Sequence, residues 1–152
     1  MQSVRDCQTK QDGSNTMANQ EALNLLRSGQ VDAYNKWIKL RRKETEKGVN
    51  LNDQDLSGLK LHFVDLRDAR LNGANLQGAE LEGADLRKAR LRGADLEGAN
   101  LHNARLRGAD LRNANLSRAN LEQAKLKKAK CKGAIFEGAN LQGVNLKDVK
   151  AL

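Results

Sequence analysis

Hydrophobic and polar residues alternate with a period of five through most of this chain. Leucine fills one position of every five-residue unit from Leu51 to Leu126, and alanine begins every unit from Ala69 to Ala139, two residues ahead of the leucine position. Polar and charged residues and glycine fill most of the other positions. A period this strict indicates that one small structural unit is repeated and stacked along the chain.

A five-residue period suits neither a continuous helix nor a straight strand. On an α-helix, leucines five apart would wind around the whole surface, and along one strand they would alternate between its two faces. The chain must therefore turn within each unit. When alanine is numbered position one and leucine position three, these two positions point the same way in a short extended segment, and positions four and five make the corner. The predicted fold is an all-β solenoid with leucine and alanine inside.

Position three supplies the predicted core. Burial of one leucine side chain stabilises the fold by about 1.5–3 kcal/mol, and alanine at position one lets neighbouring walls approach. Cysteine and phenylalanine take the leucine position near the end of the repeats, and we expect this cysteine to be a buried, inert core residue. The predicted core residues are Leu71, Leu76, Leu81, Leu86, Leu91, Leu96, Leu101, Leu106, Leu111, Leu116, Leu121, Leu126, Cys131, Phe136 and Leu141.

The repeated unit resembles a known family. Units such as Ala-Asn-Leu-Gln-Gly at 74–78 and Ala-Asp-Leu-Arg-Lys at 84–88 match the Ala-(Asp/Asn)-Leu-x-x consensus of pentapeptide-repeat proteins, and twenty consecutive units fill about two thirds of the chain. The resemblance implies a right-handed quadrilateral β-helix with four units per coil, hence about five coils. Residues twenty apart would then stack in one column, with coils about 4.8 Å apart.

A different pattern precedes the repeats. Residues 1–19 are polar and are expected to be a disordered tail or extension; 20–48 carry helical periodicity and are expected to form an α-helical N-terminal cap; 49–150 form the repeat domain. The cap would cover the unpaired backbone of the first coil, and a separate recognition helix is the alternative. The segment is also similar to the helical lead-in of many cyanobacterial pentapeptide-repeat proteins. The predicted packing residues of the cap are Leu25, Leu26, Val31, Tyr34, Trp37 and Ile38.

Composition adds location and assembly to these expectations. The chain has 152 residues, 3% aromatic residues and no proline, and no apolar run approaches the roughly 20 residues that span a bilayer. We expect no membrane association and a cytoplasmic location. The last repeat leaves an open edge, for which a homodimer through the C-terminal coil, a covering partner and a truncated chain are the three explanations.

Charge is segregated on the predicted solenoid. The chain carries a net charge of +8, and with a twenty-residue coil the first and fourth faces hold fifteen basic and six acidic residues, whereas the second and third hold two basic and seven acidic. The predicted partner-binding residues lie on the basic half. On the fourth face they are Arg67, Arg87, Arg107, Lys127 and Lys147, and on the first face Arg70, Arg90, Arg92, Arg112, Lys130 and Lys132.

Three functions fit this charge pattern. The basic half would dock an acidic protein surface or a second copy of the chain, track nucleic-acid phosphates, or keep an exposed β-structure soluble. Aromatic residues for base stacking are missing from the basic faces, which disfavours nucleic acid. Some pentapeptide-repeat proteins imitate DNA and bind gyrase, but a net charge of +8 disfavours that role. We expect a non-catalytic interaction or scaffold module.

Catalytic and ligand motifs are missing. His62, Glu82, His102 and Glu122 occupy one predicted column, but a straight ladder does not converge on one metal ion as zinc requires. The sequence has neither a phosphate-binding glycine loop nor a nucleophile elbow. We expect no enzyme activity, no cofactor, no metal and no small-molecule substrate.

Overall fold

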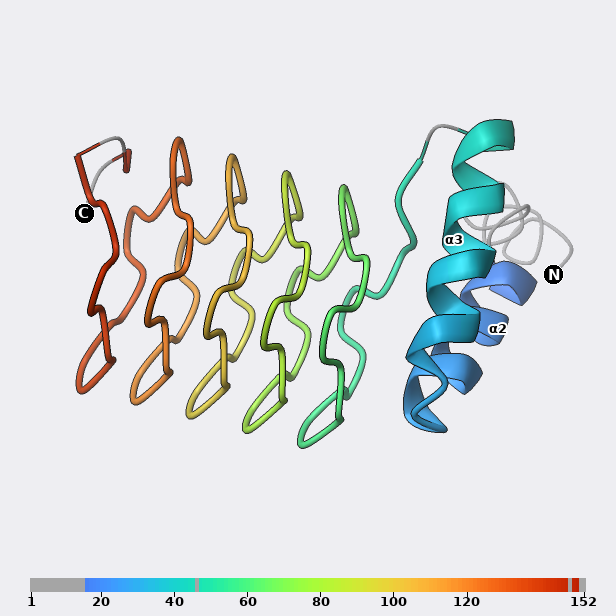
Figure 1. Ribbon diagram of the computed structural model, residues 1–152, viewed down its shortest axis with the longest axis horizontal. Coiled ribbons are helices and arrows are strands. Elements are labelled where there is room, and N and C mark those ends of the chain that lie inside the picture. Colours follow the sequence, from blue (N-terminus) through green and yellow to red (C-terminus); the bar gives the residue numbers. More distant parts are fainter. Residues whose placement is uncertain (1–15, 46, 148, 151–152) are drawn as a thin grey trace, which may run out of the picture.

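The computed structural model describes residues 16–45, 47–147 and 149–150. Two helices, α2 (Thr16–Arg27) and α3 (Val31–Thr45), are followed by a stack that extends away from them (Figure 1). The stack consists of similar coils of the backbone, each of which we call a turn. Within the described repeats, β-structure consists of isolated bridges rather than longer strands. Each side of a turn is five residues long, and two of these residues form the corner. The β-structure of the solenoid therefore consists of backbone pairing at single residues.

The turns pair in parallel at a spacing of twenty residues. Position-two residues bridge to one another, as Arg70 does to Arg90 and Asp85 to Arg105. From Leu51 to Leu121, the position-three N–H of each unit donates to the position-two carbonyl of the unit stacked on it in the next turn, for example Leu71 to Arg90 at 2.7 Å. Units twenty residues apart therefore share one face of the solenoid.

Position five makes the corner because its backbone is left-handed. Every position-five residue from Asp53 to Gly143 has a φ between 56° and 74°. The following position-one N–H donates to the position-three carbonyl across the corner, as Ala69 does to Leu66 at 3.1 Å. A positive φ in a four-residue turn favours glycine or asparagine, which explains why these residues recur at position five.

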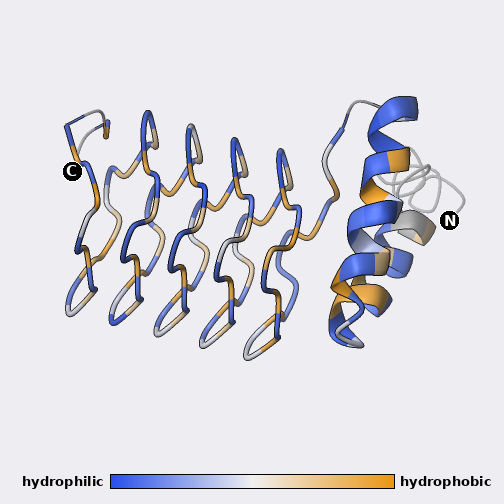
Figure 2. Ribbon diagram, viewed as in Figure 1, coloured by the Kyte–Doolittle hydropathy of each residue, from blue (hydrophilic) through white to orange (hydrophobic). Residues whose placement is uncertain are grey.

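Leucine and alanine line the inside of the stack. The position-three leucines from Leu51 to Leu126 are at most 1% exposed, and the position-one alanines from Ala69 to Ala129 at most 3%. Figure 2 shows hydrophobic segments recurring along every turn between hydrophilic ones. Cys131 is also buried, but Phe136 and Leu141 are only partly so, which differs from the predicted core. Among the described residues, only those of the preceding turn stack on Phe136 and Leu141, so one side of each side chain is not covered.

The helices depart from the expected boundaries at one end. The tail was expected to reach residue 19, but α2 begins at Thr16. Asn19 Oδ1 accepts the N–H of Asn50 in the first turn, and Gln20 donates to Asn24 at 3.0 Å one helical turn away. The polar composition of this segment did not reveal these two contacts. Residues 1–15 lie outside the described residues. Gly29, with a φ of 73°, closes α2.

The two helices pack through the residues that helical periodicity selected. Leu26, Tyr34 and Ile38 are buried, and Ala22 and Leu23 join them. The other three predicted packing residues are partly buried: Leu25, Val31 and Trp37.

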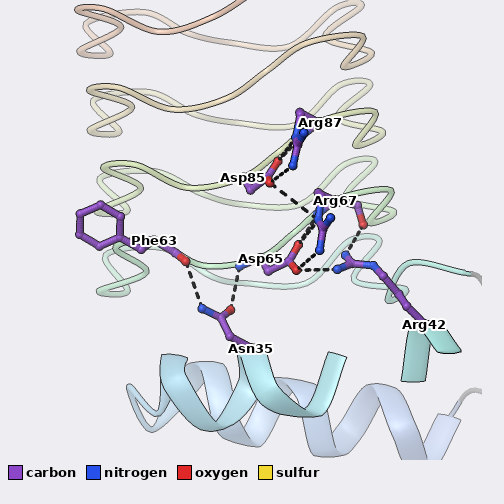
Figure 3. Close-up of polar contacts among 7 residues, drawn as sticks. All are labelled: Asn35, Arg42, Phe63, Asp65, Arg67, Asp85 and Arg87. Carbon is purple, nitrogen blue, oxygen red and sulfur yellow. Dashed lines mark hydrogen bonds and ion pairs between the residues drawn. The ribbon is translucent and has the colours of Figure 1, made fainter. Parts of the chain in front are cut away.

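Two asparagines of the helices supply acceptors to the first turns of the stack. Deeper in the stack, a position-two N–H donates to the carbonyl of a preceding turn. The N–H of Asp65 donates instead to Asn35 Oδ1 at 2.8 Å, and that of Asn50 to Asn19 Oδ1 at 3.1 Å. Asn35 Nδ2 also donates to the carbonyl of Phe63 at 3.1 Å (Figure 3). These side chains take the place of a preceding turn.

Two arginines supply the matching donors. Arg42 Nη2 donates to the carbonyl of Arg67 at 2.8 Å, and Arg27 Nη2 to that of Asp55 at 3.4 Å. In later turns, carbonyls at these positions accept from the backbone of the turn before. The helices therefore satisfy both donors and acceptors at the edge of the stack.

Candidate functional site

A local turn at position two recurs on both halves of the solenoid. Asp85 Oδ1 accepts the backbone N–H of Arg87, two residues later, at 3.3 Å, and Asn75 does the same for Gln77 at 3.0 Å. Aspartate and asparagine favour this side-chain-to-backbone turn. The turn explains the Asp/Asn preference at position two and fixes the direction of the side chain at position four.

Aspartate at position two also binds the arginine at position four. On the fourth face, Arg67 Nε and Nη2 donate to Asp65 at 2.9 and 2.7 Å, and Arg87 donates to Asp85 in the same way at 2.8 and 2.6 Å (Figure 3). Arg42 of α3 adds a third cationic contact to Asp65, at 2.5 Å. These bidentate pairs neutralise Arg67 and Arg87, the first two residues of the predicted fourth-face column.

The pairing shifts the pKa of Asp65, Arg67 and Arg87. Burial of Asp65 opposes its ionisation, but hydrogen bonds from Arg67 and Arg42 outweigh burial and lower its pKa to about 2. Hydrogen bonding to the two aspartates raises the pKa of Arg67 and of Arg87. The carboxylate of Asp65 is thus held in its charged form.

One pair of the same kind lies on the first face. Arg112 Nε and Nη2 donate to Asp110 at 2.7 and 2.5 Å. The hydrogen bond from Arg112 lowers the pKa of Asp110, and Lys130 also contributes to that shift. Arg112 is therefore less available to a partner than the predicted site assumed.

Position two changes from acidic to basic further along the fourth face. Arg105 and Lys125 replace the aspartates of the two earlier turns, and Arg107 follows Arg105 at position four. We call Arg105, Arg107 and Lys125 the cationic cluster. All three are exposed, and none makes a side-chain hydrogen bond or ion pair with another described residue.

The cationic cluster surrounds an open hollow of about 540 Å³. Arg87 and Lys127 also line it, so the cations come from three successive turns, and no carboxylate belongs to its lining within the described chain. A second hollow of about 390 Å³ lies where the fourth and first faces meet. It is lined by Lys88, Arg90, Arg92, Asp110, Arg112 and Lys130, among others.

The predicted partner-binding residues differ in whether an aspartate binds them and in how exposed they are. Those bound by an aspartate are Arg67, Arg87 and Arg112. The exposed ones are Arg107, Lys127, Lys147, Arg90, Arg92, Lys130 and Lys132, and Arg70 is half-buried. Sequence reasoning left Arg105 and Lys125 out of the site. The signal that could have found them is the change from aspartate to a basic residue at position two within one column.

Side chains on the acidic half contact one another locally. His62 Nε2 lies 2.6 Å from Glu80 Oε2, and its Nδ1 lies 3.8 Å from Glu82. Arg118 pairs with Glu97. Among the described residues, no three His, Cys, Asp or Glu side chains gather as a metal site would need.

Cys131 sits at the inner position of its turn. It is 1% exposed, and burial raises the pKa of its thiol to about 11. A thiol with a raised pKa is a poor nucleophile near neutral pH. Cys7 lies outside the described residues.

No helix in the described ranges has the length and apolar character needed to cross a bilayer. The cytoplasmic location stays a prediction.

Comparison with known protein families identifies the family of the chain. The family model for pentapeptide repeats matches residues 47–73, 74–113 and 114–150, with eight copies. The chain belongs to the pentapeptide-repeat family. Membership implies a right-handed quadrilateral β-helix, in agreement with the twenty-residue register. A comparison with curated proteins found no match.

Solved structures of pentapeptide-repeat proteins are similar to this chain. One from the Arabidopsis thaliana thylakoid lumen is 40% identical, with 66% of both chains covered and a TM-score of 0.39. Rfr23 from the cyanobacterium Cyanothece 51142 is 33% identical over 68% of this chain and 58% of its own, with a TM-score of 0.39. QnrB1, a plasmid-mediated fluoroquinolone resistance protein, is 22% identical over 72% of this chain and 56% of its own, with a TM-score of 0.44. The matches thus leave a third or more of each solved chain uncovered.

Proposed function

We propose that this pentapeptide-repeat protein is a non-catalytic interaction module whose basic half binds an acidic surface of another protein. One observation carries the proposal: the cationic cluster is exposed and makes no side-chain hydrogen bond or ion pair with another described residue, although the same fold pairs Arg67 and Arg87 with aspartates one and two turns earlier. Like charges held this close repel one another unless a partner or counter-ions neutralise them. An acidic partner would relieve that repulsion.

The charge arrangement favours a protein over nucleic acid. Single-stranded nucleic acids are held by aromatic stacking as well as by phosphate contacts. The exposed aromatic Phe63 belongs to the third face, away from the basic half, and Trp37 and Tyr34 pack in the helices. Electrostatic contact would be all that the basic half offers a nucleic acid.

A gyrase-directed role would use the other half of the molecule. Glu80 and Glu97, which would have to imitate phosphates, contact His62 and Arg118 instead. The basic half supports an acidic partner better than a DNA-mimicking one.

We also propose that α2 and α3 are the cap of a β-helix of about five coils. The support is the replacement of a preceding turn by Asn19, Asn35, Arg27 and Arg42. A sealed first turn cannot recruit another strand. Self-association through the last coil stays a prediction.

Affinity capture with three baits tests the interaction proposal. The baits are the native protein, R105Q/R107Q/K125Q, and K60Q/N103D/Q142E, which makes the same change in net charge on the third face. We expect the cluster variant to lose specific protein partners that both other baits retain. Recovery of the same proteins by all three baits would show that the cations serve solubility.

A further inference from the structure

We propose that the hollow at the cationic cluster is a binding site for an oligophosphate anion, a compact ligand with several linked phosphoryl groups. This goes beyond the interaction function, because it requires no protein partner. It also revises the expectation that the solenoid offers no small-molecule site, since the hollow lies on its outer surface.

The lining of the hollow carries the inference. Five cationic residues from three successive turns surround about 540 Å³, and no described carboxylate shares the lining. They are Arg87, Arg105, Arg107, Lys125 and Lys127. The volume lies within the range of about 300–1,000 Å³ that is typical of small-ligand sites. The hollow therefore combines room for a small anion with concentrated positive charge.

Three of these cations can form new hydrogen bonds without breaking old ones. Arg105, Arg107 and Lys125 are exposed and have no side-chain partner among the described residues. A guanidinium presents a planar fork of donors that binds phosphate oxygens in pairs. Because Arg105 and Arg107 lie on either side of buried Leu106, both guanidinium groups come from one short segment of the fourth face.

Charge density favours linked phosphates over a carboxylate peptide at this place. Along an extended peptide, side chains on one side are about 6.6 Å apart, and each carboxylate brings one charge. Linked phosphoryl groups share bridging oxygens and place several charges within a shorter length. Cations of consecutive turns, about 4.8 Å apart, match the denser ligand better.

The second hollow provides an internal contrast. Arg90, Arg92 and Lys130 contribute two guanidiniums and one ammonium to its lining, but Asp110 lies among them. A carboxylate in the lining repels an anion and already occupies Arg112. The proposal therefore predicts that the first hollow binds more tightly than the second.

Isothermal titration with sodium tripolyphosphate tests the proposal. At about 0.1 M salt, where the Debye length is about 10 Å, the native protein should bind one anion per chain. R105Q/R107Q/K125Q should weaken binding by at least about tenfold, or about 1.4 kcal/mol, because the variant loses the charge-assisted hydrogen bonds to the anion. R90Q/R92Q/K130Q, which removes the same kinds of charge from the second hollow, should weaken it by less than about twofold.

Two further titrations complete the test. A hexaglutamate peptide should bind more weakly than tripolyphosphate, and circular dichroism should show both variants folded like the native protein. Equal losses in the two triple variants, peptide binding as tight as tripolyphosphate binding, or no binding by the native protein would each overturn the proposal.

Discussion

Arg87 binds the carboxylate of Asp85, two residues earlier, through both Nε and Nη2, at 2.8 and 2.6 Å. One turn further along, Arg105 occupies the position equivalent to Asp85. Arg107 therefore has an arginine, not an aspartate, two residues before it. The same backbone thus carries a neutral pair on one turn and two adjacent cations on the next. We infer that the residue at position two decides which of the stacked arginines is available to a ligand.

Removal of the Asp65 carboxylate should destabilise the protein at neutral pH. Asp65→Asn keeps an acceptor for the backbone turn but loses the charge that Arg67 and Arg42 bind. We expect the free energy of unfolding at pH 7 to fall by about 1–2 kcal/mol, a value reduced for the partial exposure of Arg67. Urea unfolding measures it, with Asp95→Asn as a control whose carboxylate has no cationic partner among the described residues.

The same pair predicts the direction of acid sensitivity. The pKa of Asp65 is about 2 in the folded protein, against an ordinary value of 3.8. Because the folded pKa is depressed, the contribution of Asp65 is fully present above pH 4 and is lost as the pH falls from about 4 to about 2. Asp65→Asn should therefore differ most from the native protein at neutral pH and converge with it near pH 2. A constant difference across this window would contradict the assignment.

Loss of the Asn35 side chain should open the edge of the stack. Asn35→Ala removes one acceptor and one donor from the backbone at Phe63 and Asp65, and a hydrogen bond typically contributes about 0.5–1.5 kcal/mol. Amide hydrogen exchange should speed up at Asp65 while protection deeper in the stack persists. Lys36→Ala, on the exposed neighbour, is the control. Unchanged exchange at Asp65 would refute the role of Asn35.

Core substitutions should report burial along the stack. Leu101 is fully buried, so Leu101→Ala should cost about 2–5 kcal/mol. Leu146 occupies the same repeat position but is 36% exposed, so Leu146→Ala should cost clearly less. Urea midpoints of the two variants provide the measurement, and equal costs would argue against the inward assignment of position three.

The corner should tolerate asparagine but not valine. Gly98 has a φ of 65°, and a β-carbon added there would meet no atom within 4 Å, so the cost of substitution is conformational alone. Gly98→Val should destabilise the protein by about 1–2 kcal/mol, whereas Gly98→Asn should cost less because asparagine adopts this conformation more readily. A valine variant as stable as the asparagine variant would contradict the left-handed corner.

The repeat made much of the architecture predictable. A strict five-residue period identified the inward positions, because the leucine and alanine side chains that repeat are those that the stack buries. It also placed residues twenty apart in one column, as the bridges of Arg70 to Arg90 show. Phe136 and Leu141 departed from the pattern because burial depends on neighbouring turns as well as on the repeat position.

The contacts at the ends and on the surface were harder to predict. Asn19 and Asn35 act through side-chain hydrogen bonds across about thirty residues of sequence, which no local pattern reveals. On the basic half, counting charges by column missed that Asp85 neutralises Arg87, and it left Arg105 outside the predicted site. Charge pattern predicted the basic half, and pairing within each unit determined which charges remain exposed.

A nuclear magnetic resonance titration with hexaglutamate tests most directly whether unpaired cations form the binding surface. The account predicts the largest amide shift changes at residues 105–107 and at Lys125, smaller ones around 90–92, and little change at 65–67, where Arg67 is held by Asp65. Shift changes spread evenly over paired and unpaired arginines, or concentrated on the acidic half, would contradict it.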